Sequence, residues 1–319
     1  MLIGVGLTQR HQPELARHLE ALGFDGLWVG GHVLWHAPML DPLAQLAAYA
    51  AVTSRIRLGT SVLLLPLYHP VPLAKTVTTV DILSGGRVVL GVGVGGENPA
   101  EFEAVGIPVG ERGRRVDEAI PLLRALWSGE PVSRDGRFFP VREAAMAPRP
   151  VQPGGPPVWI AGRSPAALAR TARCGDGWIG IFCSPLRYDA AVREVTRQCA
   201  QAGRNPAELT FAHYLWMRTG RTREQATAGA RGYLERSYAR PFTAEQVPGF
   251  CAAGTADDLR EQVAQYAEAG CRYLIAKPAC EPDELADQCA AIAEAFRLAP
   301  SGARASAGPL APSGTPLVY

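Results

Sequence analysis

The sequence predicts an α/β fold of the (β/α)8 TIM barrel type, and three observations carry that prediction. Apolar strand-like segments alternate with helical patterns along the chain, and about eight such segments occur. The strand segments are near-continuous apolar runs, as expected when both faces of a parallel sheet are covered. The length of 319 residues is common for a single-domain barrel. A doubly wound sheet would alternate similarly, but it seldom contains this many units.

Each predicted strand is a short run rich in β-branched or aromatic residues. In chain order these strands are residues 2–7, 26–30, 56–66, 87–93, 158–161, 177–181, 209–217 and 272–277. Helical patterns follow the first four strands, at residues 13–24, at 41–53, after 69–75 up to the SGG at 84–86, and at 111–127. Residues 135–141 predict a small hairpin inserted between strands four and five. We expect one domain over residues 1–298 and a flexible Pro/Gly/Ala/Ser-rich tail over 299–319.

Composition limits the classes of function. A formal net charge of +2 favours neither nucleic acid nor an acidic membrane surface. The seven cysteines are scattered singly without a CxxC pair, which is typical of free thiols in a reducing cytosol. No basic n-region with a cleavage site precedes the first strand, and no apolar stretch approaches the ~20 residues of a membrane helix. We therefore expect a soluble cytoplasmic protein.

Two histidines follow the second strand, in "GGHVLWHAP". His32 and His36 are four residues apart, but the glutamate of an HExxH motif is missing and the segment is a strand-to-loop junction. We therefore expect no metal site here. At the carboxyl end of a barrel strand, His32 is expected either to line the pocket or to be a hydrogen-bonded loop histidine.

Glycines and polar residues mark the third and fourth strands. Gly91, Gly93 and Gly96 satisfy GxGxxG, but the strand order and the position of Asp117 inside a helical pattern argue against a Rossmann site. These glycines are expected to let a flat ligand approach the backbone. Thr60 and Ser61 interrupt an apolar strand, which indicates either hydrogen bonds within the barrel or a bulge toward the pocket.

The segment "PVWIAGRSPAAL" raises the question of an anion site. Ser164 and Pro165 are a good N-cap and first helical residue, and a well-made helix start explains them fully. Gly162 permits close backbone approach, and Arg163 adds positive charge to a helix N-terminus at the catalytic rim. These residues are about equally consistent with a plain strand-to-helix turn and with a phosphate site.

Two further residues have alternative interpretations. Lys277 ends the eighth strand and is one of only two lysines; it is expected either to hold a substrate anion or to be a surface lysine. His213, in the middle of strand seven, is expected to be a core histidine.

Taken together, these segments resemble the bacterial luciferase-like superfamily, and within it the branch of coenzyme F-420-dependent oxidoreductases. The resemblance runs from Leu2 to about Phe296, and the blocks "DILSGGRVVLGVG" and "RCGDGW" are its most specific parts. It implies a barrel that holds a deazaflavin, or alternatively FMN, at its C-terminal mouth.

The resemblance also implies site residues. A non-proline cis peptide at Ser61–Val62 would back the ring, and a phosphate would sit at the turn of Ala161, Gly162, Arg163 and Ser164. An Asp–His pair of the family maps onto Gly31 and His32, so the aspartate is missing. With His32, Ser61 and Val62, the expected cofactor contacts are Gly95, Gly96, Asn98, Ala161, Gly162, Arg163 and Ser164.

The predicted activity is hydride transfer between reduced F-420 and a small organic substrate. His32 is the first choice as proton donor, because imidazole titrates near neutral pH, and Glu97 is the second. A phosphosugar is not expected, since Ile181, Phe182 and Cys183 stand where such enzymes carry a lysine. The predicted substrate pocket comprises Trp35, His36, Tyr68, Trp178, Phe182 and Lys277.

Two other functions stay open on the sequence. One is an FMNH2-dependent two-component monooxygenase, which would need a separate reductase. The other is a non-catalytic barrel that only binds a flavin or another ligand. The resemblance suggests a homodimer formed through the helices after strands two and three.

Overall fold

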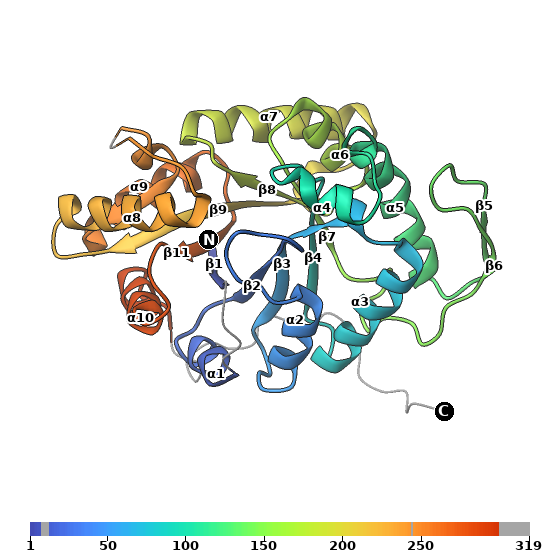
Figure 1. Ribbon diagram of the computed structural model, residues 1–319, viewed down its shortest axis with the longest axis horizontal. Coiled ribbons are helices and arrows are strands. Elements are labelled where there is room, and N and C mark those ends of the chain that lie inside the picture. Colours follow the sequence, from blue (N-terminus) through green and yellow to red (C-terminus); the bar gives the residue numbers. More distant parts are fainter. Residues whose placement is uncertain (8–12, 244, 300–319) are drawn as a thin grey trace.

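The structure is a computed structural model that describes residues 1–7, 13–243 and 245–299. It confirms the barrel: eight parallel strands close on themselves in the order β9-β11-β1-β2-β3-β4-β7-β8, and β8 pairs with β9 to complete the ring. Figure 1 shows the helices arranged around these strands. The predicted tail, residues 299–319, lies outside the described residues except for Ala299.

The barrel strands agree with the predicted runs to within about two residues. They are β1 (Leu2–Leu7), β2 (Gly26–Gly31), β3 (Arg57–Leu64), β4 (Val88–Gly93), β7 (Val158–Ala161), β8 (Gly177–Ile181), β9 (Thr210–Thr219) and β11 (Tyr273–Pro278). The two strands of the predicted hairpin are β5 (Val132–Arg134) and β6 (Val141–Ala144), which pair antiparallel. This hairpin projects at the right-hand edge of Figure 1.

Ten α-helices are present in the described part of the chain. They are α1 (Pro13–Ala21), α2 (Pro42–Ala50), α3 (Pro70–Ser84), α4 (Pro99–Ala104), α5 (Arg112–Trp127), α6 (Pro165–Cys174), α7 (Pro185–Gln201), α8 (Arg223–Tyr238), α9 (Ala256–Glu268) and α10 (Leu285–Ala295). Four short 3-10 turns accompany them: η1 (Leu65–Leu67), η2 (Val109–Glu111), η3 (Pro206–Glu208) and η4 (Val247–Gly249).

One strand was not anticipated from the sequence. Between β9 and α9 the chain forms α8, η4 and a ninth parallel strand, β10 (Cys251–Gly254). β10 pairs with residues 216–219 of β9, beyond the stretch of β9 that pairs with β8. Because this addition sits at the carboxyl end of β9, it lies at the mouth of the barrel and contributes to the site.

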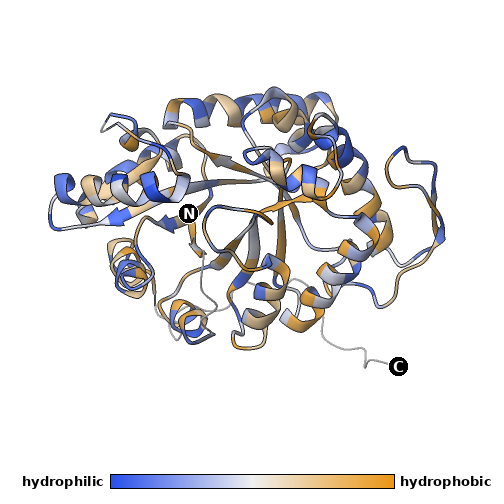
Figure 2. Ribbon diagram, viewed as in Figure 1, coloured by the Kyte–Doolittle hydropathy of each residue, from blue (hydrophilic) through white to orange (hydrophobic). Residues whose placement is uncertain are grey.

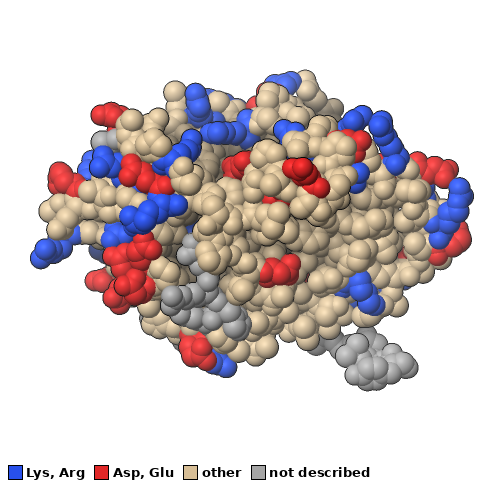
Figure 3. Space-filling model, in the orientation of Figure 1, with Lys and Arg blue, Asp and Glu red and all other residues tan. Residues whose placement is uncertain are grey.

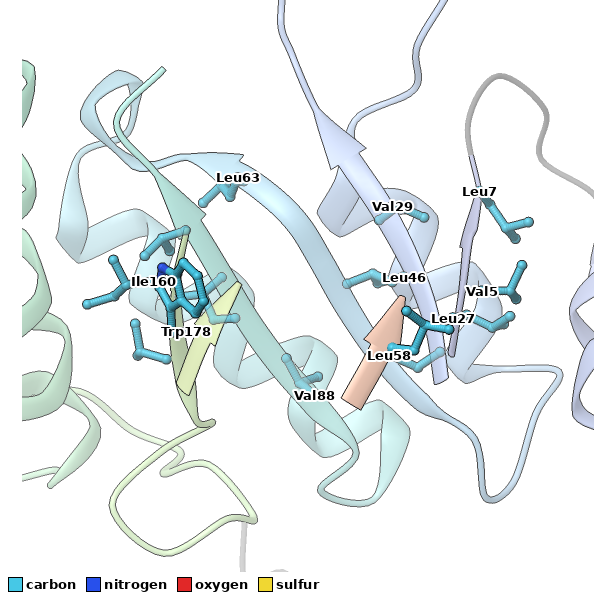
Figure 4. Close-up of a cluster of buried hydrophobic side chains, with 14 of the residues drawn as sticks. Val5, Leu7, Leu27, Val29, Leu46, Leu58, Leu63, Val88, Ile160 and Trp178 are labelled. Atoms are coloured by element: carbon cyan, nitrogen blue, oxygen red, sulfur yellow. The ribbon is translucent and has the colours of Figure 1, made fainter. Parts of the chain in front are cut away.

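The main core lies between the strands and the surrounding helices. Figure 4 shows part of it, with Val5, Leu27, Leu58 and Ile160 among the buried side chains drawn. In Figure 2 the central strands are mostly orange and the outward helix faces carry the hydrophilic colour. This pattern is expected for a barrel whose strands are covered by amphipathic helices.

The barrel interior is filled by aromatic rings near the amino ends of the strands. Trp28 stacks on Trp159 with ring centroids 5.0 Å apart, and its indole N–H donates to the Tyr273 hydroxyl at 3.2 Å. Glycines make room for these rings: a Cβ on Gly59 would lie 2.3 Å from Trp28, and one on Gly4 would lie 2.5 Å from it. These rings fill the interior near the amino ends of the strands, below the chamber that opens at the carboxyl ends.

The surface carries charges of both signs. Figure 3 shows Lys/Arg and Asp/Glu side by side around α8 to α10, without a continuous basic face on this side. Across the residues that the structure describes, no helix is long and apolar enough to cross a membrane.

Candidate active site

An inner chamber of about 250 Å³ opens at the carboxyl ends of the strands. Strands β2, β3, β4, β7, β8 and β9 and the end of α8 supply its lining. The structure brings together here nine of the residues predicted from sequence: His32, Trp35, Ser61, Val62, Gly95, Glu97, Ala161, Gly162 and Phe182. This is the end of the barrel where the fold places chemistry.

A larger outer chamber, about 1040 Å³, adjoins the inner one. Trp35, Glu97, Phe182 and Tyr238 line both chambers, and we call these four residues the neck. Three more of the predicted residues line the outer chamber only: His36, Asn98 and Arg163.

Strand β3 bulges toward the inner chamber, as one interpretation of its polar residues predicted. Its register against β4 shifts between Gly59 and Leu63, and the Ser61–Val62 peptide bond is cis, as the resemblance implied. The Thr60 hydroxyl donates to the carbonyl oxygen of Gly91 at 2.6 Å. A Cβ on Gly91 would lie 1.9 Å from the Thr60 carbonyl oxygen, so this glycine accommodates the bulge.

The glycine run therefore serves two purposes, which corrects the expectation that all of it receives a ligand. Gly91 packs against the β3 bulge, whereas Gly93 and Gly95 line the chamber. Gly96 lines neither chamber. Its φ is +107°, and the position of its missing Cβ lies 3.2 Å from Nε of Arg112, which covers it.

His32 is held by a buried carboxylate. Its Nδ1–H donates to Oε2 of Glu101 at 3.0 Å, and the other oxygen of Glu101 accepts the backbone N–H groups of Val33 at 2.7 Å and Leu34 at 3.1 Å. The Glu101 side chain is 0% exposed. This pairing fixes the ring and leaves Nε2 free to exchange a proton, with Oε2 of Glu97 3.8 Å away.

The missing aspartate at position 31 has a structural reason. A Cβ on Gly31 would lie 2.9 Å from the carbonyl oxygen of Val62 and 3.2 Å from the Pro42 ring. The β3 bulge therefore leaves no room for an acidic side chain here. Glu101, from helix α4, supplies a carboxylate to His32 from another direction.

Aromatic stacking fixes the loop that carries His32. The Trp35 ring stacks on His32 with centroids 4.0 Å apart and lies 4.2 Å from the His36 ring. His36 donates from Nε2 to the backbone carbonyl of Ser237 near the end of α8. The loop is thus joined to α8 across the mouth of the barrel. Among the described residues, no three His, Cys, Asp or Glu side chains are grouped so as to hold a metal ion.

The turn after β7 joins a glycine of positive φ to the N-terminus of α6. Gly162 has a φ of +127°, and a Cβ there would lie 2.9 Å from that of Ala167, so only glycine fits. Ser164 caps α6 by accepting the Ala167 N–H at 3.2 Å. Arg163 donates to the Phe182 carbonyl at 2.6 Å, which places its guanidinium at the outer chamber. Ala161 and Gly162 line the inner chamber, whereas Ser164 lines neither chamber.

Three residues predicted for the substrate pocket lie elsewhere. The Trp178 indole is fully buried outside the barrel against Tyr188, and it donates to the Gly162 carbonyl at 2.7 Å. It therefore supports the turn from behind. Tyr68 packs against the outer core, and burial raises the pKa of its hydroxyl to about 12. Neither residue lines a chamber.

Lys277 is likewise neither a surface residue nor a chamber residue. It is 2% exposed inside the barrel, with Nζ 3.4 Å from the Gly6 carbonyl oxygen and 5.6 Å from the Trp216 ring centroid. Burial lowers the pKa of this amine to about 7. Since Trp216 itself lines the inner chamber, Lys277 lies one layer away from it.

Glu101 and the aromatic residues of β9 and α8 were not predicted from the sequence. Tyr214 and Trp216 alternate along β9 and face the inner chamber, joined by Tyr233 and Tyr238 of α8. Their period-two spacing in "TFAHYLWMRT" was an available signal, since alternate residues of a barrel strand face inward. Burial raises the pKa of Tyr238, with the Glu97 carboxylate adding to the effect, so the phenol stays protonated at neutral pH.

Comparison with known proteins places this site in a family. The luciferase-like monooxygenase family matches residues 4–273, and the chain belongs to it. An uncharacterized protein of Mycobacterium tuberculosis is 36% identical over 173 residues, which is 54% of this chain and 59% of that protein, so the match spans less than two thirds of it. The phthiodiolone/phenolphthiodiolone dimycocerosates ketoreductase of Mycobacterium bovis is 27% identical over 320 residues, covering 80% of this chain and 84% of that one.

Solved structures share the fold at low identity. The monooxygenase RslO1 of Streptomyces bottropensis has a TM-score of 0.82 at 24% identity, covering 93% of this chain and 99% of that one. An F420-dependent secondary alcohol dehydrogenase holding an F420-acetone adduct has a TM-score of 0.80 at 22% identity, with the same coverage. The oxygenating constituent of 3,6-diketocamphane monooxygenase of Pseudomonas putida, in complex with FMN, has a TM-score of 0.76 at 17% identity over 92% of this chain and 97% of that one.

Proposed function

We propose that this chain is an oxidoreductase that transfers hydride between reduced coenzyme F-420 and a small organic carbonyl compound. One observation carries the proposal: His32, fixed by the buried Glu101, presents Nε2 to a chamber backed by the β3 bulge. The ketoreductase relative and the fold shared with a secondary alcohol dehydrogenase support a carbonyl or alcohol as substrate.

The residues present fit a deazaflavin. The β3 bulge at Ser61 and Val62 offers a flat backing, and the chamber lining is largely apolar, with Ile179 and Tyr214 among its residues. An anionic group on the ribityl side would meet Gly162, where the close approach of Ala167 requires a glycine, and the positive end of α6. When bound, the reduced ring supplies the hydride.

The chain's own residues would then control the proton. A proton at Nε2 of His32 passes to the carbonyl oxygen as the carbonyl carbon becomes an alcohol carbon, and the reverse direction returns it. Glu101 accepts from Nδ1 and so orients the ring with Nε2 toward the chamber. Glu97, 60% exposed at the neck, is placed to relay the proton to solvent. Trp35, Phe182 and Tyr238 exclude water from the reacting atoms.

The phosphate of a phosphosugar does not fit the inner chamber, which has no Lys or Arg among its described lining residues. The position after β8 holds Phe182, which lines both chambers, and Cys183, which is buried. Neither offers a cation, so the inner chamber suits an apolar group.

The second candidate function is an FMNH2-dependent two-component monooxygenase. The 24%-identical fold match is a monooxygenase, and the family itself carries that name. The third alternative, a barrel that only binds a ligand, is disfavoured by the His32–Glu101 pair. A buried carboxylate that orients a pocket histidine is typical of an acid–base site.

The test is the substitution His32→Ala. We expect turnover of a ketone with reduced F-420 to fall at least a hundredfold, because general acid catalysis contributes about 10²–10⁴-fold. Circular dichroism and F-420 affinity, measured on the same preparation, report whether the fold and the pocket are retained. Unchanged turnover and unchanged affinity would remove His32 from the mechanism.

A further inference from the structure

The sizes of the two chambers restrict where a substrate can bind. The inner chamber, about 250 Å³, falls short of the ~300–1,000 Å³ usual for a small-molecule pocket. If a three-ring cofactor head lies over the β3 bulge, as the proposed function requires, little of this chamber remains. The substrate must then reach through the neck into the outer chamber, which measures about 1040 Å³.

Four aromatic rings form a continuous wall in the outer chamber. The Phe182 centroid lies 5.6 Å from that of Tyr238 and 5.2 Å from that of Phe250. Phe242 closes the set, with its centroid 5.5 Å from Phe250 and 6.0 Å from Tyr238. All four residues line the outer chamber. Such a wall favours the body of an aromatic or aliphatic molecule.

The same chamber has an excess of positive charge. Arg163 and Arg240 line it, and Glu97 is the one carboxylate among its described lining residues. The guanidinium carbon of Arg240 lies 4.5 Å from the Phe242 centroid, so the cation is held over the aromatic wall. In the part of the chain that the structure describes, Arg240 has no ion pair. Arg236, four residues earlier and within α8, is by contrast paired with Glu281.

We propose that the outer chamber is a substrate subsite for an organic acid, whose apolar body lies on Phe182, Phe242 and Phe250 and whose carboxylate binds Arg240. The reactive end of such a substrate passes the neck toward His32. This inference rests on the proposed function for the position of the reacting end. The binding of the acid itself is a separate property of the outer chamber.

A carboxylate bound here has two sources, the substrate or an acidic extension of the cofactor. The probes are therefore 4-phenylbutanoate and its uncharged match 4-phenylbutanamide, titrated by calorimetry into the full chain without cofactor. The variants are Arg240→Gln, which removes the charge, and Phe250→Ala, which removes one ring of the wall. Arg236→Gln is the matched control, since it removes a paired arginine that lies four residues earlier in the chain. F-420 and FMN affinities are measured for each protein.

We expect the acid to bind about tenfold more tightly than the amide, as one charge-assisted hydrogen bond allows. Arg240→Gln should abolish this preference without changing cofactor affinity, and Arg236→Gln should preserve it. Phe250→Ala should weaken both probes. Equal affinities for acid and amide, no binding of either, or a preference that survives Arg240→Gln would overturn the proposal. The proposal would also be overturned if Arg240→Gln lost affinity for F-420 while still preferring the acid to the amide, because Arg240 would then bind an anionic group of the cofactor. Absence of F-420 and FMN binding to the unaltered chain would instead contradict the proposed function alone.

Discussion

His213 should make the folded protein sensitive to acid. The side chain is fully buried on β9 and contacts the rings of Tyr188 and Tyr266. Burial lowers its pKa from 6.5 to about 3. As predicted from the sequence, this is a core histidine.

The sign and size of the effect follow from linkage between protonation and folding. Between pH 6.5 and about pH 3 the unfolded chain binds a proton at His213 that the folded chain does not. Stability therefore falls as the pH falls below 6.5, by about 1.4 kcal/mol per pH unit. At pH 5.0 the loss at this one residue is about 2 kcal/mol relative to pH 7.5.

The assay is urea unfolding of the unaltered chain and of His213→Phe at pH 7.5 and 5.0. Phenylalanine keeps a flat ring beside Tyr266 and cannot titrate, so groups other than His213 contribute equally to both proteins. We expect the stability difference between them to shift by about 2 kcal/mol in favour of the variant at the lower pH. A difference that stays constant between the two pH values would refute the reasoning.

Three further predictions concern the site and the assembly. Glu101→Ala should lower the free energy of unfolding by about 2–4 kcal/mol in chemical denaturation, because the Val33 and Leu34 amides lose their acceptor. Glu101→Gln keeps an acceptor oxygen and should lower this free energy less. Equal losses in the two variants would contradict the role of the acceptor. Gly162→Ala should lower the affinity for FMN or F-420 at least tenfold in calorimetry, because a side chain at a φ of +127° costs about 1–3 kcal/mol. The affinity for riboflavin, which lacks the phosphate, should not change. An equal loss for riboflavin would contradict a phosphate site. Light scattering should find a dimer. Leu83 is 59% exposed on α3, and Leu83→Glu should dissociate the dimer. A monomeric unaltered chain would contradict this prediction.

The strands were predictable because a covered parallel sheet needs long apolar runs, and turn residues bound each run. The hairpin was predictable in its position only, because residues 135–141 interrupt the alternation. Its strands, β5 and β6, lie at either end of this segment. β10 was not, because "CAAG" has four small residues with no periodicity of its own and acquires a strand conformation only by pairing with β9.

Site residues were predictable where the backbone itself is unusual. Gly162 and the polar residues of β3 depart from what a plain strand needs, and they mark the turn and the bulge. The inward or outward direction of a side chain was harder to assign. Trp178 lies on a strand that is apolar on both faces, so composition does not show that it faces the helices. Glu101 resembles a surface residue of a short helix, and only the folded chain reveals that His32 and two amides require it.

The most direct test of the central claim is a calorimetric titration of the full chain with F-420 and with FMN, each oxidised and reduced, coupled to an oxygen electrode. We expect F-420 to bind more tightly than FMN, and the complex with reduced F-420 to consume a ketone without oxygen uptake. Tighter binding of reduced FMN accompanied by oxygen uptake, or no binding of either cofactor, would contradict it.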